Sequence, residues 1–300
     1  MPDKLACGIL PALCTPFDDS GQQVAVERVP ALVDALLKAE ATGFFVCGGT
    51  GEGKSMTVPE RKQMAEAAIS AVSDAVPVIL QVGATSTENA VELARHAATV
   101  GADAVASVAP IDQPNDLDAA VRHYTAIGAA TDLPFYVYWL AQTADKNVTA
   151  EQYLEAMTDV PNFTGVKFTD TNFFMFQQLV DLSDRKLNMI TGPDEMCVAG
   201  MVMGSDAAIG STYNVLPRLF VQMRKDFESG DIHDSMEAQK HANRIIRLMF
   251  RAGGVLPSIK AMLGWCDIPV GPPREPFQPL TSEGEQILRH GLAHLEFEIG

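Results

Sequence analysis

A single lysine, Lys167, ends the apolar run Phe163–Val166, where a β-strand is expected to finish. An amine attacks a carbonyl carbon only when it is unprotonated, and an ordinary lysine has a pKa of about 10.4. Burial or a nearby cation lowers such a pKa, so a lysine at an apolar strand end is a candidate nucleophile. The alternative is a structural lysine whose stem lies along the strand while its ammonium reaches water.

A tyrosine ends a second apolar run, Phe135-Tyr136-Val137-Tyr138. Because side chains alternate along a strand, Tyr136 and Tyr138 are expected on the same side of it. A phenol beside a catalytic amine can carry a proton to and from a substrate oxygen, which makes Tyr138 the second catalytic candidate. The alternative is an aromatic side chain that fills the core.

A glycine-rich segment, Gly48-Gly49-Thr50-Gly51-Glu52-Gly53, follows another apolar run. Its glycines would let backbone N–H groups turn toward a carboxylate or phosphate, and the Thr50 hydroxyl adds a donor. The residues after it lack the spacing of a P-loop. An anion site at Gly49 and Thr50 and a turn without any ligand are both open.

Two acidic residues, Asp194 and Glu195, follow the apolar run Leu187–Thr191. They could cap the next helix at its N-terminal amides, or accept hydrogen bonds from sugar hydroxyls at a pocket rim. The sequence contains no HExxH motif and no tight cluster of His, Asp and Glu. A mechanism without a metal or other cofactor is therefore predicted.

Short apolar runs alternate with amphipathic stretches along the chain, which predicts an α/β protein. Helical patterns over Pro59–Ala71, Thr87–Val100 and Asp116–Ala129 follow three of the runs. Strands that are apolar on both faces, in eight such units, favour a (β/α)8 TIM barrel over the alternative of an open, doubly wound sheet. The eight candidate strands are Gly8–Cys14, Gly43–Cys47, Val76–Val82, Ala104–Val108, Phe135–Tyr138, Phe163–Val166, Leu187–Thr191 and Ala207–Gly210.

In such barrels, chemistry takes place at the carboxyl ends of the strands. Polar and glycine-rich residues of this chain fall at those ends and are expected to line one pocket. They are Thr15, residues 48–52, Tyr138, Lys167, Gly192-Pro193-Asp194-Glu195 and Ser211-Thr212.

The last part of the chain is longer than one closing helix requires. Helical patterns cover Leu216–Phe227, Ser235–Ala252 and Pro257–Cys266, and no linker rich in Pro, Gly and Ser precedes them. We therefore expect residues 1–214 to form the barrel and residues 215–300 to form a C-terminal helical extension that packs on it as one structural unit.

Composition restricts the classes of partner. The 300 residues include 22 Lys and Arg against 38 Asp and Glu, a net charge of −16, which opposes binding to nucleic acid or to an anionic membrane surface. Five scattered cysteines without a CxxC pair predict neither a disulfide framework nor a zinc site. The N-terminal residues lack the apolar segment of a signal peptide, so a cytoplasmic protein is expected.

Several ordered motifs resemble the dihydrodipicolinate synthase / N-acetylneuraminate lyase family of pyruvate-dependent class I aldolases, over nearly the whole chain. The resemblance implies that Lys167 forms a Schiff base with a 2-oxo acid, that Tyr138 assists proton transfer, and that the loop of Gly49 and Thr50 holds the substrate carboxylate. It also implies a homotetramer. The matching pieces are Pro11–Phe17, Gly48–Glu52, Tyr138, Gly165–Lys167, Gly210–Asn214 and Gly271–Arg274.

Within the family, the chain looks most like the sialic acid lyase branch. Lys167 is followed by Phe168-Thr169-Asp170, as in those lyases, and no arginine follows Tyr138 where a lysine-biosynthetic synthase normally has one. The resemblance implies substrate cleavage to N-acetylmannosamine and pyruvate. It further assigns contacts with the sugar to Thr169, Gly192, Asp194, Glu195 and Ser211.

The chain departs from the family pattern at three places. Gly49 stands where the glycine-rich loop usually carries the first of two hydroxyl residues, a form that also resembles the sugar-acid dehydratase branch. Ala141 replaces a proline, and Ile111-Asp112 replaces an aromatic pair. The alternatives to a sialic acid lyase are therefore a sugar-acid dehydratase or aldolase of the same family, and a barrel that binds keto acids without turnover.

Overall fold

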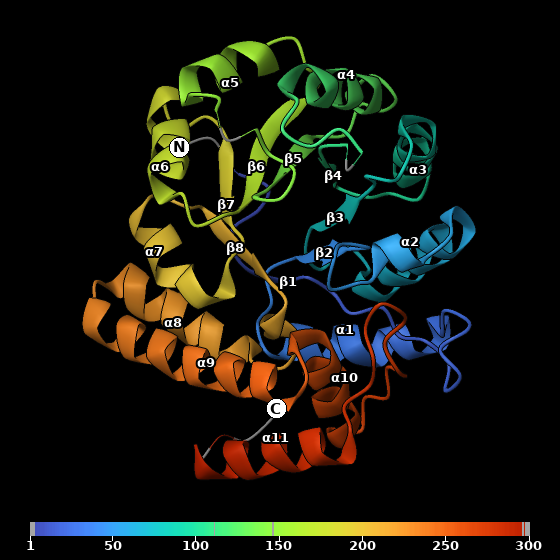
Figure 1. The fold of residues 1–300 in the computed structure, drawn as a ribbon. Helices are drawn as coiled ribbons and strands as arrows, with labels where there is room; N and C mark the ends of the chain where they lie inside the picture. The colour runs from blue at the N-terminus through green and yellow to red at the C-terminus, as the bar shows by residue number, and fades with distance from the viewer. Residues whose placement is uncertain (1–3, 111, 146, 296, 298–300) are drawn as a thin grey trace.

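The computed structural model describes residues 4–110, 112–145, 147–295 and 297. Over these residues, eight parallel strands form one sheet in the order β1-β8-β7-β6-β5-β4-β3-β2 (Figure 1). The strands are β1 (Gly8–Pro11), β2 (Phe44–Val46), β3 (Val78–Gln81), β4 (Ala104–Val108), β5 (Phe135–Leu140), β6 (Phe163–Thr169), β7 (Asn188–Thr191) and β8 (Ala207–Gly210).

The two ends of this strand order, β1 and β2, meet and close the sheet. Just after β1, Ala12 forms a parallel bridge with Phe45, and the Leu13 N–H donates to the Phe45 carbonyl at 2.9 Å. The predicted (β/α)8 TIM barrel is therefore confirmed, and the alternative of an open sheet is wrong.

Helices surround the strands, as Figure 1 shows. Three predicted helices are found within one residue of their predicted bounds, because local signals start them: the Asp116 side chain, for example, accepts from the Ala119 N–H at 2.8 Å and caps α4. The helices of the barrel are α1 (Val29–Lys38), α2 (Val58–Val72), α3 (Thr87–Thr99), α4 (Leu117–Gly128), α5 (Ala150–Met157), α6 (Phe173–Leu182), α7 (Cys197–Val202) and α8 (Pro217–Ser229).

Alternation along the strands separates two apolar layers. The layer inside the barrel includes Leu10, Phe45, Ala106, Tyr136 and Ile190. The larger layer lies between the strands and the surrounding helices. The interior is thus a packed core, and only its carboxyl end is available for chemistry.

Several strand ends differ from the prediction. β6 continues to Thr169 and β5 to Leu140, because the ladder between them extends through the pair Trp139 and Phe168, whose rings stack 5.4 Å apart. Lys167 consequently lies within β6 and not just beyond it. β1 ends at Pro11, before the predicted Cys14, whose N–H instead donates to the Asn214 side chain at 3.1 Å.

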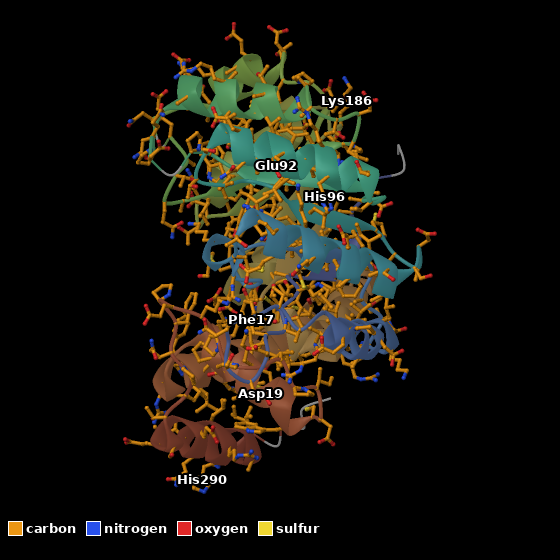
Figure 2. The ribbon with its side chains drawn as sticks, turned by 90° about the vertical axis from the view of Figure 1, so that its right-hand side faces the viewer. Phe17, Asp19, Glu92, His96, Lys186 and His290 are labelled. Atoms are coloured by element: carbon orange, nitrogen blue, oxygen red, sulfur yellow. The ribbon has the colours of Figure 1, made fainter. Side chains whose placement is uncertain are left out.

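Among the described residues, three further helices follow α8: α9 (Ile232–Ala252), α10 (Val255–Trp265) and α11 (Ser282–His294). α8 packs against β1 and α9, and α9 packs against α10 and α11. In the side view of Figure 2 the helices of this region lie at the lower end of the molecule, near Phe17 and Asp19. That residues 1–214 and 215–300 behave as one unit stays a prediction.

The sequence pattern does not predict α11. Two glycines within it, Gly284 and Gly291, lower its intrinsic helix propensity. In the fold they allow close packing, since a Cβ at Gly284 would lie 2.2 Å from the Ala252 carbonyl oxygen and one at Gly291 would lie 2.4 Å from Leu248. Tertiary contacts therefore outweigh local preference in this helix.

Candidate functional site

The buried side chain of Lys167 lies between two aromatic rings in the barrel interior. Its Nζ is 3.9 Å from the ring centre of Tyr138 and 4.1 Å from that of Phe45. Among the described residues, no hydrogen-bond acceptor or carboxylate pairs with this nitrogen. Aromatic faces attract positive charge, so this position suits an ammonium and equally an iminium formed from it.

Tyr138 lies directly across the β5–β6 ladder from Lys167. Its ring is half-buried and meets the edge of Phe45, with ring centres 5.7 Å apart. Tyr136 is also in the barrel interior, as predicted, but its hydroxyl donates to the buried Asn188 side chain at 2.7 Å. Of the two tyrosines, Tyr138 lies nearer the carboxyl end of the strand.

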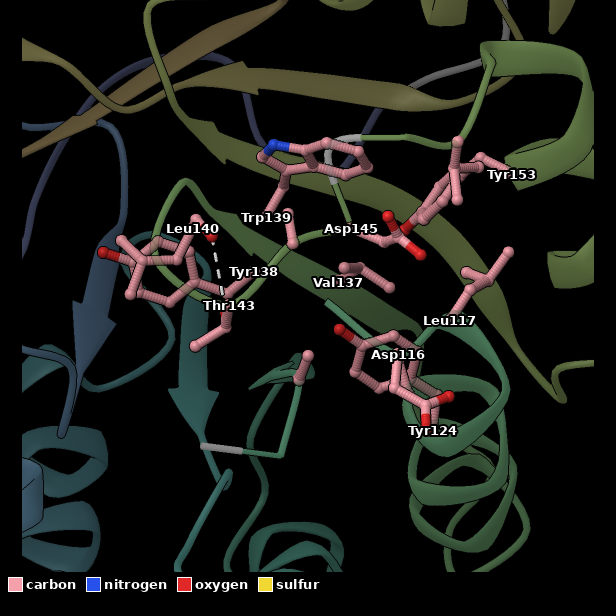
Figure 3. A pocket seen from close by; sticks show the side chains of 14 residues that line it. Asp116, Leu117, Tyr124, Val137, Tyr138, Trp139, Leu140, Thr143, Asp145 and Tyr153 are labelled. Carbon is pink, nitrogen blue, oxygen red and sulfur yellow. Dashed lines mark hydrogen bonds between the residues drawn. The ribbon is translucent and has the colours of Figure 1, made fainter. Parts of the chain in front are cut away.

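Figure 3 shows the opposite side of β5, where a cavity of about 20 Å³ lies among Trp139, Tyr124 and Tyr153. A volume of this size holds about one water molecule. In the view, the Tyr138 ring points away from Trp139 and Tyr153. This cavity is therefore a gap in the core between strand and helices, and the reactive face of β5 is the other one.

The glycine-rich loop after β2 is a tight turn. The Glu52 N–H donates to the Gly49 carbonyl and the Gly53 N–H to the Gly48 carbonyl, each at 3.0 Å. A Cβ at Gly53 would lie 2.0 Å from a backbone oxygen, whereas a Cβ at Gly49 would meet no heavy atom within 4 Å. Packing thus demands glycine at position 53 but not at position 49.

Thr50 connects this loop to the end of β8. Its Oγ1 lies 2.6 Å from the Oγ of Ser211, and both side chains are half-buried. The structure therefore brings together two residues that are 161 positions apart in the sequence. Both had been predicted to line the pocket.

Asp194 is buried beside the loop that follows β8. Its Oδ2 accepts from the Thr212 N–H and from the Thr212 hydroxyl, each at 2.7 Å. Burial raises the pKa of Asp194 to about 6, against the opposing effects of these hydrogen bonds and of the Lys167 charge. The side chain does not cap the helix that follows it, so that predicted alternative is wrong.

The other predicted sugar contacts lie at the ends of β6 and β7. Gly192 is needed there, because its Cβ would lie 2.0 Å from the Thr169 Oγ1. The Thr169 hydroxyl is buried and has no hydrogen-bond partner among the described residues. Glu195 is exposed, and its backbone oxygen accepts from the Asn243 side chain at 3.1 Å.

A cleft of about 310 Å³ opens at the carboxyl ends of β2 to β5, with Gly48, Gly49 and Tyr138 in its wall. Among the described residues that line this cleft, Lys167 and Asp194 are absent. The cleft therefore contains only some of the residues that were predicted to share one pocket. Ile111, one of the departures from the family pattern, lies outside the described residues.

Two important partners of these groups, Phe45 and Lys260, were not predicted, and Thr212 was predicted at the pocket but without its contact to Asp194. Alternation within β2 could have placed Phe45 in the barrel interior. The contacts of Thr212 with Asp194 and of Lys260 with the glycine-rich loop join distant segments, and no local pattern indicates them.

The described residues contain no group of three or more His, Cys, Asp or Glu side chains that could hold a metal ion. The absence of a metal from the mechanism remains a prediction. In the same residues, no helix is both long and apolar enough to cross a membrane.

A closed parallel barrel with a buried lysine facing a tyrosine on the adjacent strand defines a (β/α)8 protein equipped for amine chemistry. The sequence model of the Dihydrodipicolinate synthetase family matches residues 5–295. This chain belongs to that family.

Individual relatives have similar length and fold. The chain is 34% identical to an N-acetylneuraminate lyase of Mus musculus, covering 99% of this chain and 94% of the relative. It is 31% identical to an N-acetylneuraminate lyase of Rhizobium meliloti, covering 95% and 94%. The solved structure of a Ruminococcus gnavus sialic acid aldolase superposes with a TM-score of 0.92 at 29% identity, covering 97% of each chain.

Proposed function

We propose that this protein is a Schiff-base carbon–carbon lyase that cleaves N-acetylneuraminate to N-acetylmannosamine and pyruvate. The observation that carries the proposal is the Lys167 amine, buried between the rings of Phe45 and Tyr138 in a barrel of this family. The N-acetylneuraminate lyases and the sialic acid aldolase to which the chain is similar support the choice of substrate.

In the first step, the Lys167 amine attacks the C2 carbonyl carbon of the open-chain 2-oxo acid, and water leaves to give a protonated imine. This imine carries the positive charge that the amine would carry when protonated. The adjacent ring faces of Phe45 and Tyr138, 4.1 Å and 3.9 Å from Nζ, stabilise that charge.

In the second step, the Tyr138 oxygen, which gave its proton to the departing water in the first step, accepts the proton of the C4 hydroxyl while the C3–C4 bond breaks. The bonding electrons move to the imine nitrogen and produce an enamine, and the C4 oxygen becomes the aldehyde of the released sugar. Protonation of the enamine at C3 and hydrolysis of the imine then release pyruvate and restore the Lys167 amine.

We assign the substrate carboxylate to the glycine-rich loop. Backbone N–H groups beside Gly49 and the hydroxyl of Thr50 are its donors, and Ser211, 2.6 Å from Thr50, supports the latter. The loop needs such donors because the net charge of the chain, −16, does not attract an anion.

We assign the sugar hydroxyls to Thr169, Gly192, Asp194 and Glu195. Both hydrogen bonds from Thr212 go to the Oδ2 of Asp194, which leaves its Oδ1 to accept from a hydroxyl. The unpartnered hydroxyl of Thr169 supplies a further polar contact.

A second candidate is a sugar-acid dehydratase or aldolase of the same fold. Gly49 favours it, because the position is exposed with open space for a Cβ, so the missing hydroxyl is not imposed by packing. A dehydratase of this kind would release water from a deoxy keto acid without forming pyruvate. We further propose that the reaction needs no metal, and that the protein works as a cytoplasmic homotetramer.

The deciding experiment measures pyruvate release from N-acetylneuraminate, coupled to NADH oxidation by lactate dehydrogenase. Rapid release that is lost in Lys167→Ala is the expected result. If the wild type releases no pyruvate from N-acetylneuraminate but dehydrates a 2-keto-3-deoxy sugar acid, the second candidate is established instead.

A further inference from the structure

The glycine-rich loop ends in a buried acidic residue, Glu52, whose partners come from the C-terminal helical region. Its Oε1 lies 2.6 Å from the Nζ of Lys260 in α10, and the two side chains are 0% and 2% exposed. Its Oε2 accepts from the backbone N–H of Arg274 at 2.6 Å. Both oxygens of one loop carboxylate are thus held by segments more than 200 residues further along the chain.

Lys260 reaches the same loop by a second route. Its Nζ also donates to the carbonyl of Thr15 at 3.1 Å and to that of Pro272 at 3.2 Å. The Thr15 hydroxyl in turn donates to the Gly51 carbonyl at 2.6 Å. The lysine therefore fixes Glu52 directly and Gly51 through Thr15.

The Arg274 side chain binds the segments on either side of this contact, near Gly21 and after the glycine-rich loop. Its guanidinium donates to the carbonyls of Gly21 at 2.7 Å and Ser55 at 3.2 Å, and it forms an ion pair with Glu60 at 2.7 Å. Glu60 belongs to α2, which begins shortly after the loop. The C-terminal region therefore contacts the loop that carries Thr50 at Glu52, and also contacts the segment that follows it.

Stability alone does not call for a charged pair at this position. Two apolar side chains of similar size often replace a buried ion pair without loss of stability, because removing two charges from water costs about as much as their attraction returns. The ion pair together with the directional hydrogen bond from the Arg274 N–H does, however, hold Glu52 in place. Glu52 has a φ of 54°, a left-handed conformation that non-glycine residues adopt rarely.

We propose that Glu52 and Lys260 are positioning residues for the substrate carboxylate, which they orient through the Thr50 loop without touching the substrate. The inference rests on the proposed function of that loop. The pair holds the turn at Glu52, while two residues earlier in the loop Thr50 lies 2.6 Å from Ser211. Its loss is expected to weaken carboxylate binding more than it slows bond cleavage.

The test compares the wild type with the double variant Glu52→Gln/Lys260→Met, which leaves no buried charge unpaired. Glu52→Gln alone is the second variant, since it keeps the shape of the side chain and an acceptor for the Arg274 N–H. Glu92→Gln is the matched control, because it removes the carboxylate of an exposed ion pair with Lys62. Each protein is trapped with borohydride over a range of pyruvate concentrations, and labelling at Lys167 is followed by mass spectrometry.

The expected result is a rise of about tenfold or more in the pyruvate concentration for half-maximal labelling of the two Glu52 variants, with near-normal labelling at saturation. KM for cleavage rises in parallel, kcat changes less, and the control matches the wild type. Variants that fold and show the wild-type dependence on pyruvate overturn the positioning role alone. Failure of the wild type itself to be labelled overturns the proposed function.

Discussion

At the residue scale, the chemistry depends on a small set of contacts around one amine. Lys167 and Tyr138 face each other across adjacent strands, and Phe45 closes the third side with its ring 4.1 Å from the amine. The carboxylate loop contributes Thr50, whereas position 49 offers no side chain at all. Gly49 is therefore the departure from the family pattern whose effect on substrate binding can be tested most directly by substitution.

We predict that Gly49→Ser folds normally and strengthens binding of the 2-oxo acid. A Cβ at this position meets no heavy atom within 4 Å, so the change in stability should stay within about 0.5 kcal/mol. A hydroxyl that donates to the carboxylate should lower KM for the substrate by up to about tenfold. Steady-state kinetics and thermal melting provide the two measurements.

Gly53→Ser is the matched control, because its Cβ would lie 2.0 Å from the Cys47 carbonyl oxygen. This variant should melt at a clearly lower temperature. An unchanged or higher KM in a well-folded Gly49→Ser variant would show that the loop does not hold the carboxylate at position 49.

At the element scale, the strand ends position the site by contacts between loops. Asp194, after β7, accepts two hydrogen bonds from Thr212, after β8, and this ties neighbouring loops together. Burial raises the pKa of Asp194 from 3.8 to about 6, so the folded state binds a proton more tightly than the unfolded state does. This group therefore favours folding at low pH, and that contribution is lost as the pH rises from about 4 to about 6.

We predict that Asp194→Asn removes this pH dependence. The difference in unfolding free energy between variant and wild type should shift in favour of the variant by up to about 3 kcal/mol between pH 4 and pH 7. Denaturant unfolding of both proteins at each pH measures it, and shared effects of other groups cancel in the comparison. A constant difference across this range would mean that Asp194 is not a buried, protonatable group.

The sequence predicts elements much better than it predicts their ends. Apolar runs and alternation identify all eight strands, and Lys167 and Tyr138 follow from residue type and strand position. The extension of β6 to Thr169 depends on pairing with β5, which the sequence of β6 alone does not show. The glycines of α11 lower its predicted helix propensity, although packing on α9 stabilises the helix in the fold. The contacts of Thr212 with Asp194 and of Lys260 with Glu52 follow from no local pattern for the same reason, since only the fold brings each pair together.

At the scale of the whole molecule, barrel and C-terminal helices share contacts that argue for one cooperative unit. Lys260 in α10 reaches the loop after β2, and α8 packs on β1. Each part also contains one tryptophan: Trp139 lies in β5 and Trp265 in α10. Unfolding of residues 1–214 and 215–300 can therefore be followed separately.

We predict that Trp139→Phe and Trp265→Phe, each leaving one reporter, unfold with coincident midpoints by fluorescence. Leu288→Ala in α11 should lower both midpoints equally, because a fully buried leucine contributes about 2–5 kcal/mol. Early melting of the Trp265 signal alone would instead make residues 215–300 a separate unit.

The central claim is that Lys167 forms the covalent link to the substrate. The most direct measurement adds pyruvate and borohydride to the wild type, Lys167→Ala and Tyr138→Phe, and locates any added mass by peptide mapping. We predict labelling at Lys167 in the wild type and in Tyr138→Phe, which keeps the ring beside the amine, and no labelling in Lys167→Ala. Labelling at another lysine, or equal labelling of Lys167→Ala, would contradict the account.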